Sequence, residues 1–193
     1  MSPLRGFCGS MLLAIGLVPV SSARADDSAV WALLKKPGHI VMLRHSNAPG
    51  STPEPYGIDL KNCAIQRSLD DAGRAQARRI GSEFRKHGIT HLRLVSSQFC
   101  RALETAKLTG LGPVAELPAL NQVFLTDVSG MRESADKTTK FMKTVPAKQL
   151  TMLVSHVTNI QAIAGANLSS GEMAVLHIDA AGAVVVDGRI LVP

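Results

Sequence analysis

Three short stretches of this sequence place histidine, arginine or serine directly after a run of apolar residues. They are Leu43-Arg44-His45, Val95-Ser96-Ser97 with Arg101 shortly after, and Val154-Ser155-His156. A short apolar run bounded by turn residues is typical of a buried strand. The carboxyl ends of parallel strands share one edge of a sheet, where open α/β proteins bind their ligands. We therefore expect two histidines and two arginines to meet at one edge.

These residue types suit a doubly charged anion such as a phosphate group. An arginine guanidinium matches phosphate oxygens with paired hydrogen bonds and keeps its charge at physiological pH. Arg67, which lies just before a predicted helix, is a third candidate for the same pocket. A lone histidine after a strand is more often structural, so this interpretation depends on the three strand ends taken together.

The elements that must position these stretches alternate along the chain. Predicted strands cover residues 40–45, 92–95 and 150–154, and predicted helices cover 26–36, 98–109, 132–145 and a segment from a cap at Ser68 to about His87. A helix opening near Thr158 and a terminal hairpin of strands 173–178 and 183–186 follow. This order predicts an α/β fold, a three-layer α/β/α arrangement with a mainly parallel central sheet.

Two segments without sustained periodicity are predicted to line the entrance of the site. Residues 46–62 form a long loop that leaves directly from His45, and long loops in compact domains are usually functional or disordered. Residues 111–131 are predicted to be mostly loop, with a short strand near Val114-Ala115.

The first 25 residues are typical of a secretory signal peptide. Arg5 gives a positive start, residues 11–18 a short apolar core, and Ala23-Arg24-Ala25 a cleavage site. Pro19 interrupts the apolar run well before the ~20 residues that a membrane helix needs. We therefore expect an exported protein, periplasmic or secreted, without stable membrane insertion, whose residues 26–193 form one domain.

The charge balance argues against a nucleic-acid partner. Removing Arg5 and Arg24 with the signal peptide reduces the 21 basic residues to 19 against 15 acidic ones, a net charge of +4. The sequence has no long run of like charges and only seven aromatic residues, counted as one Trp, one Tyr and five Phe. A basic pocket for a small phosphorylated substrate or inorganic phosphate fits better.

Cysteine and histidine usage gives two further expectations. Cys63 and Cys100 remain after cleavage, and an even count in an exported chain favours a disulfide over two buried thiols. The six histidines contain no His-Glu-x-x-His motif, so no metal site is predicted.

The stretches described above resemble the motifs of the histidine phosphatase superfamily, which includes acid phosphatases and cofactor-dependent phosphoglycerate mutases. The matching residues are Leu43-Arg44-His45, the segment from Ser96 to Ala106, Leu153-Val154-Ser155-His156, and the segment from Leu69 to Ala77, which resembles the family's first helix. The resemblance implies a phosphoglycerate mutase-like fold with no large cap domain. It also implies a metal-independent phosphatase, without cofactor, that acts on phosphomonoesters.

The resemblance also assigns roles to individual residues. His45 would attack phosphorus and form a phosphohistidine that water hydrolyses. Arg44, Arg67, Arg101 and His156 would hold the phosphate oxygens. Glu104 would orient neighbouring basic groups, and Ser46, where the family usually has glycine, would hydrogen-bond in the pocket. A disulfide between Cys63 and Cys100 would hold two phosphate-binding arginines together.

The proton donor departs from the family pattern. Many members have a glutamate between the second and third motifs, and residues 120–127 lack it. Asp127 is the first candidate for this role and Glu133 the second. If neither serves, the substrates are limited to those with good leaving groups, such as phosphohistidine, acyl phosphates or aryl phosphates.

Three other functions are also compatible with the sequence. The missing glutamate suggests a non-catalytic protein that binds a phosphorylated ligand on the same scaffold. A phosphotransferase or mutase would use the same pocket, but it is less favoured because a stable pool of phosphorylated cofactor is not expected where an exported protein acts. A structural envelope protein would use its basic residues to contact acidic polysaccharide.

Overall fold

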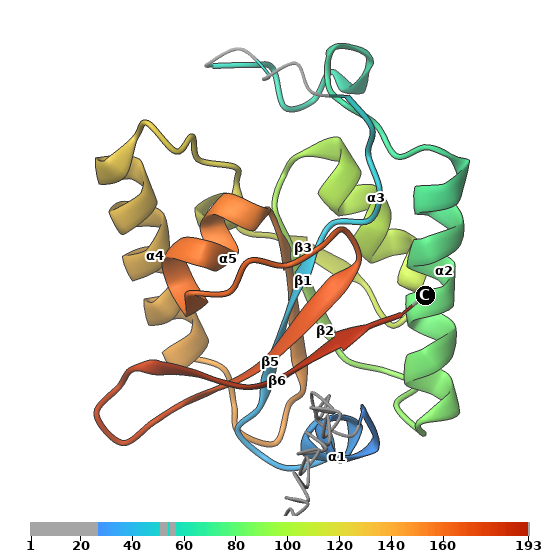
Figure 1. The fold of residues 1–193 in the computed structure, drawn as a ribbon, viewed down its shortest axis with the longest axis vertical. Coiled ribbons are helices and arrows are strands. Elements are labelled where there is room, and N and C mark those ends of the chain that lie inside the picture. Colours follow the sequence, from blue (N-terminus) through green and yellow to red (C-terminus); the bar gives the residue numbers. More distant parts are fainter. Residues whose placement is uncertain (1–26, 51–53, 55–56, 193) are drawn as a thin grey trace, which may run out of the picture.

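The computed structural model describes residues 27–50, 54 and 57–192, so the predicted signal peptide lies outside the described residues. The described part contains a six-stranded sheet in the order β3-β2-β4-β1-β5-β6 (Figure 1). The strands are β1 (Ile40–Arg44), β2 (Arg93–Ser96), β3 (Val114–Glu116), β4 (Thr151–Ser155), β5 (Glu172–Ile178) and β6 (Val184–Leu191). Strands β1 to β4 run parallel, and the hairpin β5–β6 is antiparallel. The predicted α/β fold with a mainly parallel sheet is confirmed.

Helices cover both faces of the sheet. Helices α1 (Asp27–Leu33), α2 (Asp71–Lys86) and α3 (Cys100–Thr109) lie on one face, and α4 (Val128–Lys143) and α5 (Val157–Ala164) on the other (Figure 1). The short 3-10 helices η1 (Cys63–Ile65) and η2 (Pro118–Leu120) lie in the connections. Within the described residues, no helix is long and apolar enough to cross a membrane.

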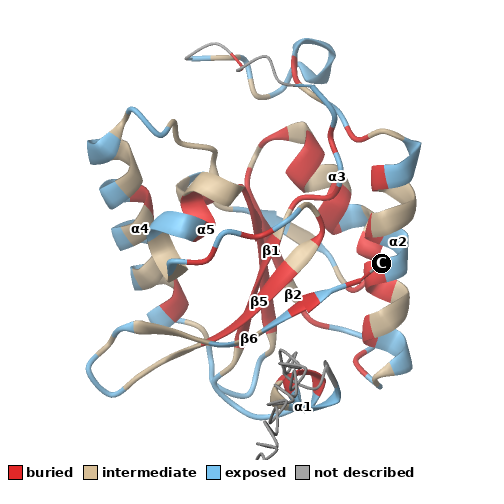
Figure 2. Cartoon of the chain, in the orientation of Figure 1, coloured by how far each residue is buried: buried red, intermediate tan, exposed pale blue. Residues whose placement is uncertain are grey.

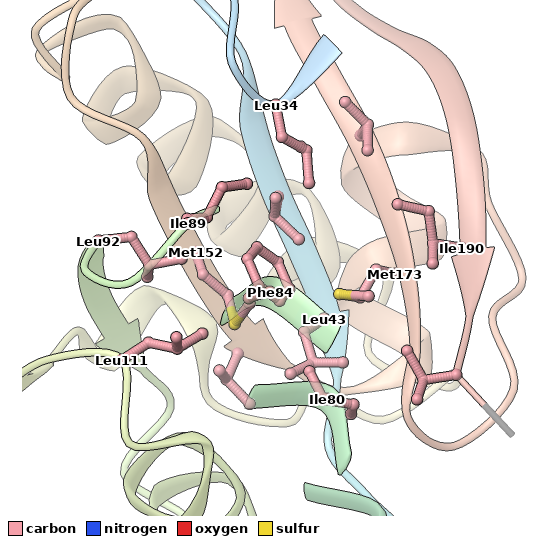
Figure 3. Packing of buried hydrophobic residues seen from close by; sticks show 14 of the residues in the cluster. Leu34, Leu43, Ile80, Phe84, Ile89, Leu92, Leu111, Met152, Met173 and Ile190 are labelled. Atoms are coloured by element: carbon pink, nitrogen blue, oxygen red, sulfur yellow. The ribbon is translucent and has the colours of Figure 1, made fainter. Parts of the chain in front are cut away.

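Strand β1 shows why the centre of the sheet is apolar on both faces. Val41 and Leu43 pack into the cluster under α1, α2 and α3, whereas Ile40 and Met42 pack into the cluster on the side of α4 and α5. A parallel strand covered on both faces needs such a continuous apolar run. Buried residues follow the central strands in Figure 2, and Figure 3 shows Leu43 packed near Ile80 of α2.

Aspartate side chains set the starts of two helices differently from the prediction. The cap of α2 is Asp70 rather than Ser68, because the Asp70 carboxylate accepts a hydrogen bond from the amide of Gly73. Helix α4 begins at residue 128 rather than 132, because Asp127 caps it. An aspartate at this position stabilises a helix by about 1 kcal/mol, which decides a boundary that periodicity leaves open.

Two glycines let α2 approach its neighbours closely. A side chain at Gly73 would place its Cβ 2.0 Å from the carbonyl oxygen of Asn47, and one at Gly81 would lie 1.9 Å from that of Thr109. Helix α2 therefore packs directly against the backbone that leaves His45 and against the end of α3.

Candidate active site

The carboxyl ends of β1, β2 and β4 bring the three predicted stretches together. The amide of His45 donates to the carbonyl of Ser155 over 3.0 Å, and the amide of Ser97 donates to that of Val154 over 2.9 Å. Each of the three stretches therefore leaves the sheet at the same edge. The rings of His45 and His156 lie there with their centroids 5.2 Å apart.

His45 is buried, and one of its ring nitrogens is unprotonated. Its Nδ1 lies 2.8 Å from the carbonyl oxygen of Ser46, which only accepts, so the ring proton is assigned to Nδ1. Its Nε2 then accepts a hydrogen bond from Arg101 Nε at 3.2 Å. Burial, followed by the charge of Arg101, lowers the pKa of His45 to about 3. The ring is therefore neutral and nucleophilic at physiological pH.

Arg101 connects the groups of the site. Its fully buried side chain lies at the start of α3. Besides its bond to His45, its Nη1 lies 2.5 Å from Glu54 Oε1, and its Nη2 donates to Gln122 and lies 3.4 Å from His156 Nδ1. Burial lowers the pKa of Arg101, and the charge of Glu54 raises it in part. The guanidinium is thus held by partners on all three nitrogens.

Arg44 and Arg67 add two more positive charges. Arg44 Nη1 donates to the carbonyl of Leu168 at 2.7 Å, and Arg67 Nη1 donates to that of Gly50 at 3.1 Å. The charge of Arg67 contributes to lowering the pKa of both histidines and of the other two arginines, so it faces the same centre. In the described part of the chain, no group of three or more His, Cys, Asp or Glu side chains could hold a metal ion.

Four buried side-chain atoms in the described residues have no hydrogen-bond partner, and all four belong to residues of this site. They are Arg44 Nε, Ser46 Oγ, Arg67 Nε and Glu54 Oε2. Buried polar atoms are nearly always hydrogen-bonded in folded proteins, so a cluster of exceptions indicates a place for a ligand. Two guanidinium N–H groups and a hydroxyl are suitable donors for the oxygens of a phosphate group.

His156 is buried and neutral as well. Its Nε2 lies 2.8 Å from the hydroxyl of Ser97, which donates to Asn121 Oδ1 at 3.2 Å, so the ring proton is assigned to Nε2. Its Nδ1 then faces Arg101 as an acceptor. Burial, followed by the charges of His45 and Arg101, lowers the pKa of His156 well below its usual value.

A profile of the histidine phosphatase superfamily (branch 1) matches residues 40–145, which contain His45, Arg67 and Arg101. The chain belongs to the histidine phosphatase superfamily. Among curated proteins, none matches the sequence.

Solved structures share the superfamily fold at low sequence identity. The protein histidine phosphatase SixA, in complex with tungstate, is 15% identical with a TM-score of 0.57, over 79% of this chain and 96% of that chain. Phosphoserine phosphatase from Entamoeba histolytica, with 3-phosphoglyceric acid, is 14% identical with a TM-score of 0.60, over 80% and 97%. A mycobacterial glucosyl-3-phosphoglycerate phosphatase is 17% identical with a TM-score of 0.55, over 78% and 97%.

The two acids proposed as proton donors of this histidine phosphatase superfamily member belong to helix α4, which Asp127 caps and which contains Glu133. The Asp127 carboxylate caps α4, accepting from the amide of Gly130 at 2.8 Å and from the hydroxyl of Ser129 at 3.0 Å. Glu133 is exposed and forms an ion pair with Lys137. Both carboxylates are therefore engaged in helix α4 itself.

Glu104 and Ser46 occupy different surroundings. Glu104 Oε1 lies 3.7 Å from Arg74 Nη1 on α2, a half-exposed pair outside the arginine cluster. Ser46 is fully buried beside His45, and its amide donates to the hydroxyl of Thr105 at 3.0 Å. This bond ties the residue after His45 to helix α3.

Glu54 and Gln122 are site residues that the sequence analysis did not identify. Glu54 lies between two prolines in a loop without periodicity, so its place in the loop that follows His45 was the one available signal. Gln122 is a neutral amide in an irregular segment, and nothing in its residue type indicated an arginine partner. Both reach Arg101 only through the tertiary fold.

A cavity of about 230 Å³ opens beside Arg101. Its apolar walls are the side chains of Ile58, Leu60, Phe99, Val123 and Phe124, and its polar walls include Asn121 and Gln122. The Phe99 ring lies 4.7 Å from the Arg101 guanidinium carbon and 5.1 Å from the His156 ring, centroid to centroid. Asp127 lies at the wall of this cavity. The space adjoins the cationic groups and can accommodate the remainder of a phosphorylated molecule.

The predicted disulfide between Cys63 and Cys100 is present. It joins η1, four residues before Arg67, to the first residue of α3, directly before Arg101. The amide of Cys100 also donates to Gln66 Oε1 at 3.0 Å. The bond therefore fixes the loop that carries Arg67 to the helix that carries Arg101.

The buried neutral state of His45 makes stability depend on pH. The unfolded histidine has a pKa near 6.5, whereas the folded pKa is about 3, so the unfolded chain binds a proton in this range that the folded chain does not. The free energy of unfolding falls as pH is lowered, by about 2 kcal/mol from pH 7 to pH 5 for this residue. The free energy of unfolding of His45→Asn, measured with denaturant at each pH, should lack that part of the pH dependence. The exposed variant His91→Asn is the matched control. An unchanged dependence in His45→Asn would contradict a buried neutral ring.

Loss of the disulfide should weaken both the fold and the site. The two cysteines are 37 residues apart, and closing such a loop stabilises a protein by about 3–4 kcal/mol. The double variant Cys63→Ser, Cys100→Ser should unfold at a lower temperature and bind inorganic phosphate several-fold more weakly in calorimetry. Reductant should bring the wild type to the same values and leave the variant unchanged. Equal phosphate affinity in the two forms would show that the bond does not organise the pocket.

Proposed function

We propose that this chain is a metal-independent phosphatase that hydrolyses phosphomonoesters through a phosphohistidine on His45. The observation that carries the proposal is a neutral histidine whose unprotonated Nε2 lies beside three arginines, two of which, Arg44 and Arg67, have an unpartnered Nε–H. A nucleophile and an oxyanion-binding set at one place are the two requirements of phosphoryl transfer to a side chain.

Each residue of the site has a physical task in this reaction. His45 Nε2 attacks phosphorus, and the bond from Nδ1–H to the carbonyl of Ser46 stabilises the ring as it becomes positively charged. The Arg101 Nε–H that now contacts His45 Nε2 is released to a phosphate oxygen. Arg44 and Arg67 each offer an unpartnered Nε–H to the other oxygens. These donors stabilise the charge that spreads over the oxygens in the transition state.

The fold supports the same proposal. SixA is a protein histidine phosphatase whose structure holds tungstate, a tetrahedral oxyanion, and the Entamoeba histolytica enzyme is a phosphoserine phosphatase. Their activities belong to those proteins, and their low identity to this chain leaves its substrate to be determined by assay. Membership of the superfamily supports a phosphatase over the alternative of an envelope protein that contacts polysaccharide.

A second candidate is a protein that binds a phosphorylated ligand without hydrolysing it. The segment of residues 120–127 favours it, because its contact with Arg101 is the amide of Gln122, and its one carboxylate, Asp127, caps α4. An amide cannot supply a proton to a leaving alkoxide. Binding would then use the same arginines and need no turnover.

Phosphate release from p-nitrophenyl phosphate and from phosphosugars, measured with EDTA between pH 4 and 8, distinguishes the two functions. The phosphatase should turn over at least one substrate, and His45→Ala should lose activity by about 1000-fold or more because no nucleophile remains. His91→Ala, a change at an exposed histidine that is not a residue of the site, should retain full activity. Phosphate binding by calorimetry without His45-dependent turnover would support the binding protein.

We also propose that the chain is exported to the periplasm or secreted. The signal-peptide pattern of residues 1–25 supports this, and the disulfide supports it because such bonds persist in oxidising compartments. Expression of the full chain in a Gram-negative host should yield a periplasmic protein whose mass is that of a chain beginning at Asp26. Recovery of the uncleaved chain from the cytoplasm would contradict export.

A further inference from the structure

Glu54 is a buried acid placed against the phosphate-binding arginines. Its side chain lies in the loop between β1 and α2, and the residue is 6% exposed. Its Oε1 accepts from Arg101 Nη1 at 2.5 Å and from the backbone amide of Arg67 at 3.0 Å. Its Oε2 is buried and has no partner within the described residues. One carboxylate oxygen is therefore fixed in place, and the other is available.

Other acidic side chains near the site are engaged elsewhere. Glu54 is the one buried acidic residue in the described part of the chain. The charge of Glu172 raises the pKa of Arg44. The two carboxylate oxygens of Glu172 are already occupied, because they accept hydrogen bonds from Arg189 Nε at 2.9 Å and from the amide of Ser169 at 2.7 Å. Asp127 caps α4 through its Oδ1. By position and available oxygen, Glu54 is the carboxyl group best placed to exchange a proton with a bound phosphate ester.

We propose that Glu54 is the proton donor for the leaving alcohol and the proton acceptor for the attacking water, so that the substrates include alkyl phosphomonoesters. This inference rests on the proposed phosphatase function. It replaces Asp127 and Glu133 in the role that the sequence analysis gave them. It also removes the restriction to phosphohistidine, acyl phosphates and aryl phosphates.

In the proposed reaction, the negative charge of the bound substrate lets the Glu54 carboxyl group gain its proton. In the unliganded protein the guanidinium of Arg101 pairs with the carboxylate. A bound phosphate dianion shares that guanidinium and places negative charge beside Glu54. A like charge nearby favours the protonated form of a carboxyl group, so the proton is taken up as substrate binds.

The proposed reaction has two steps, and Glu54 gives up a proton in the first and regains one in the second. In the first, His45 Nε2 forms a bond to phosphorus, the ester P–O bond breaks, and the Glu54 carboxyl proton passes to the leaving oxygen to give an alcohol. In the second, the Glu54 carboxylate takes a proton from water as its oxygen attacks phosphorus. The P–N bond then breaks, and inorganic phosphate leaves with His45 and protonated Glu54 restored.

The dependence of rate on the leaving group separates proton transfer from mere positioning of Arg101. An alkoxide needs a proton as it leaves, whereas p-nitrophenolate is stable without one. Loss of a general acid typically costs about 100- to 10,000-fold. Glu54→Gln should therefore lower kcat on glycerol 2-phosphate and phosphoserine by at least about 100-fold. Its kcat on p-nitrophenyl phosphate should fall by less than about 10-fold, which also shows that the variant folds.

Matched variants and pH profiles complete the experiment. Glu83→Gln makes the same chemical change on the outer surface of α2 and should leave both activities unchanged. The alkyl phosphatase activity of the wild type should decline on the alkaline side as the donor loses its proton, and this limb should be absent in Glu54→Gln. Asp127→Asn should not show the selective loss on alkyl phosphates.

Several results would overturn the proposal. Equal losses on alkyl and aryl phosphates in Glu54→Gln would mean that Glu54 only positions Arg101. An unchanged rate in that variant, or selective loss in Asp127→Asn, would assign the proton transfer elsewhere. Each of these outcomes leaves the phosphatase function standing, whereas the absence of any His45-dependent turnover overturns both proposals together.

Discussion

The site depends on one buried positive charge, the guanidinium of Arg101. Moving a cation out of water costs several kcal/mol unless partners surround it, and this one has a partner on every nitrogen. Glu54 compensates the charge, while Gln122 and the two histidines accept its remaining hydrogen bonds. The contacts that offset the cost of burying this cation also fix its orientation. Arg101 is therefore held in position before any ligand arrives, and in the proposed reaction its bonds to His45 and Glu54 are the ones that change.

The neutral state of the histidines follows from the same constraint. Burial and nearby arginine charge both disfavour an imidazolium, so the field that attracts a phosphate also keeps His45 able to attack it. A bound dianion offsets part of this field, which then accommodates the positive charge that develops on the ring when Nε2 bonds to phosphorus. In the proposed reaction, binding and nucleophilic attack are thus coupled through electrostatics.

The scaffold divides the site between rigid and irregular parts. His45 and His156 leave parallel strands at the middle of the sheet, where both faces are packed, so their backbones are fixed by the core. Glu54 and Arg67 come from an irregular connection that has no core of its own. The disulfide between Cys63 and Cys100, and the Arg101–Glu54 pair, attach that connection to α3. Rigid elements thereby supply the nucleophile, and a tethered loop supplies charge and the proposed proton donor.

The sequence alone determined the fold class, the strand ends and the family. Apolar runs that end in His45, Ser97 and His156 identified the edge of the sheet, because buried parallel strands leave a strong local pattern. The pairing of Cys63 with Cys100 followed from the cysteine count in a chain with a predicted export signal. Tertiary structure decided the rest. Helix starts depended on single aspartate caps, and the partners of Arg101 came from segments with no periodicity. Glu54 and Gln122 could not be identified beforehand, because their importance lies in contacts across 47 and 21 residues of chain that local patterns do not encode.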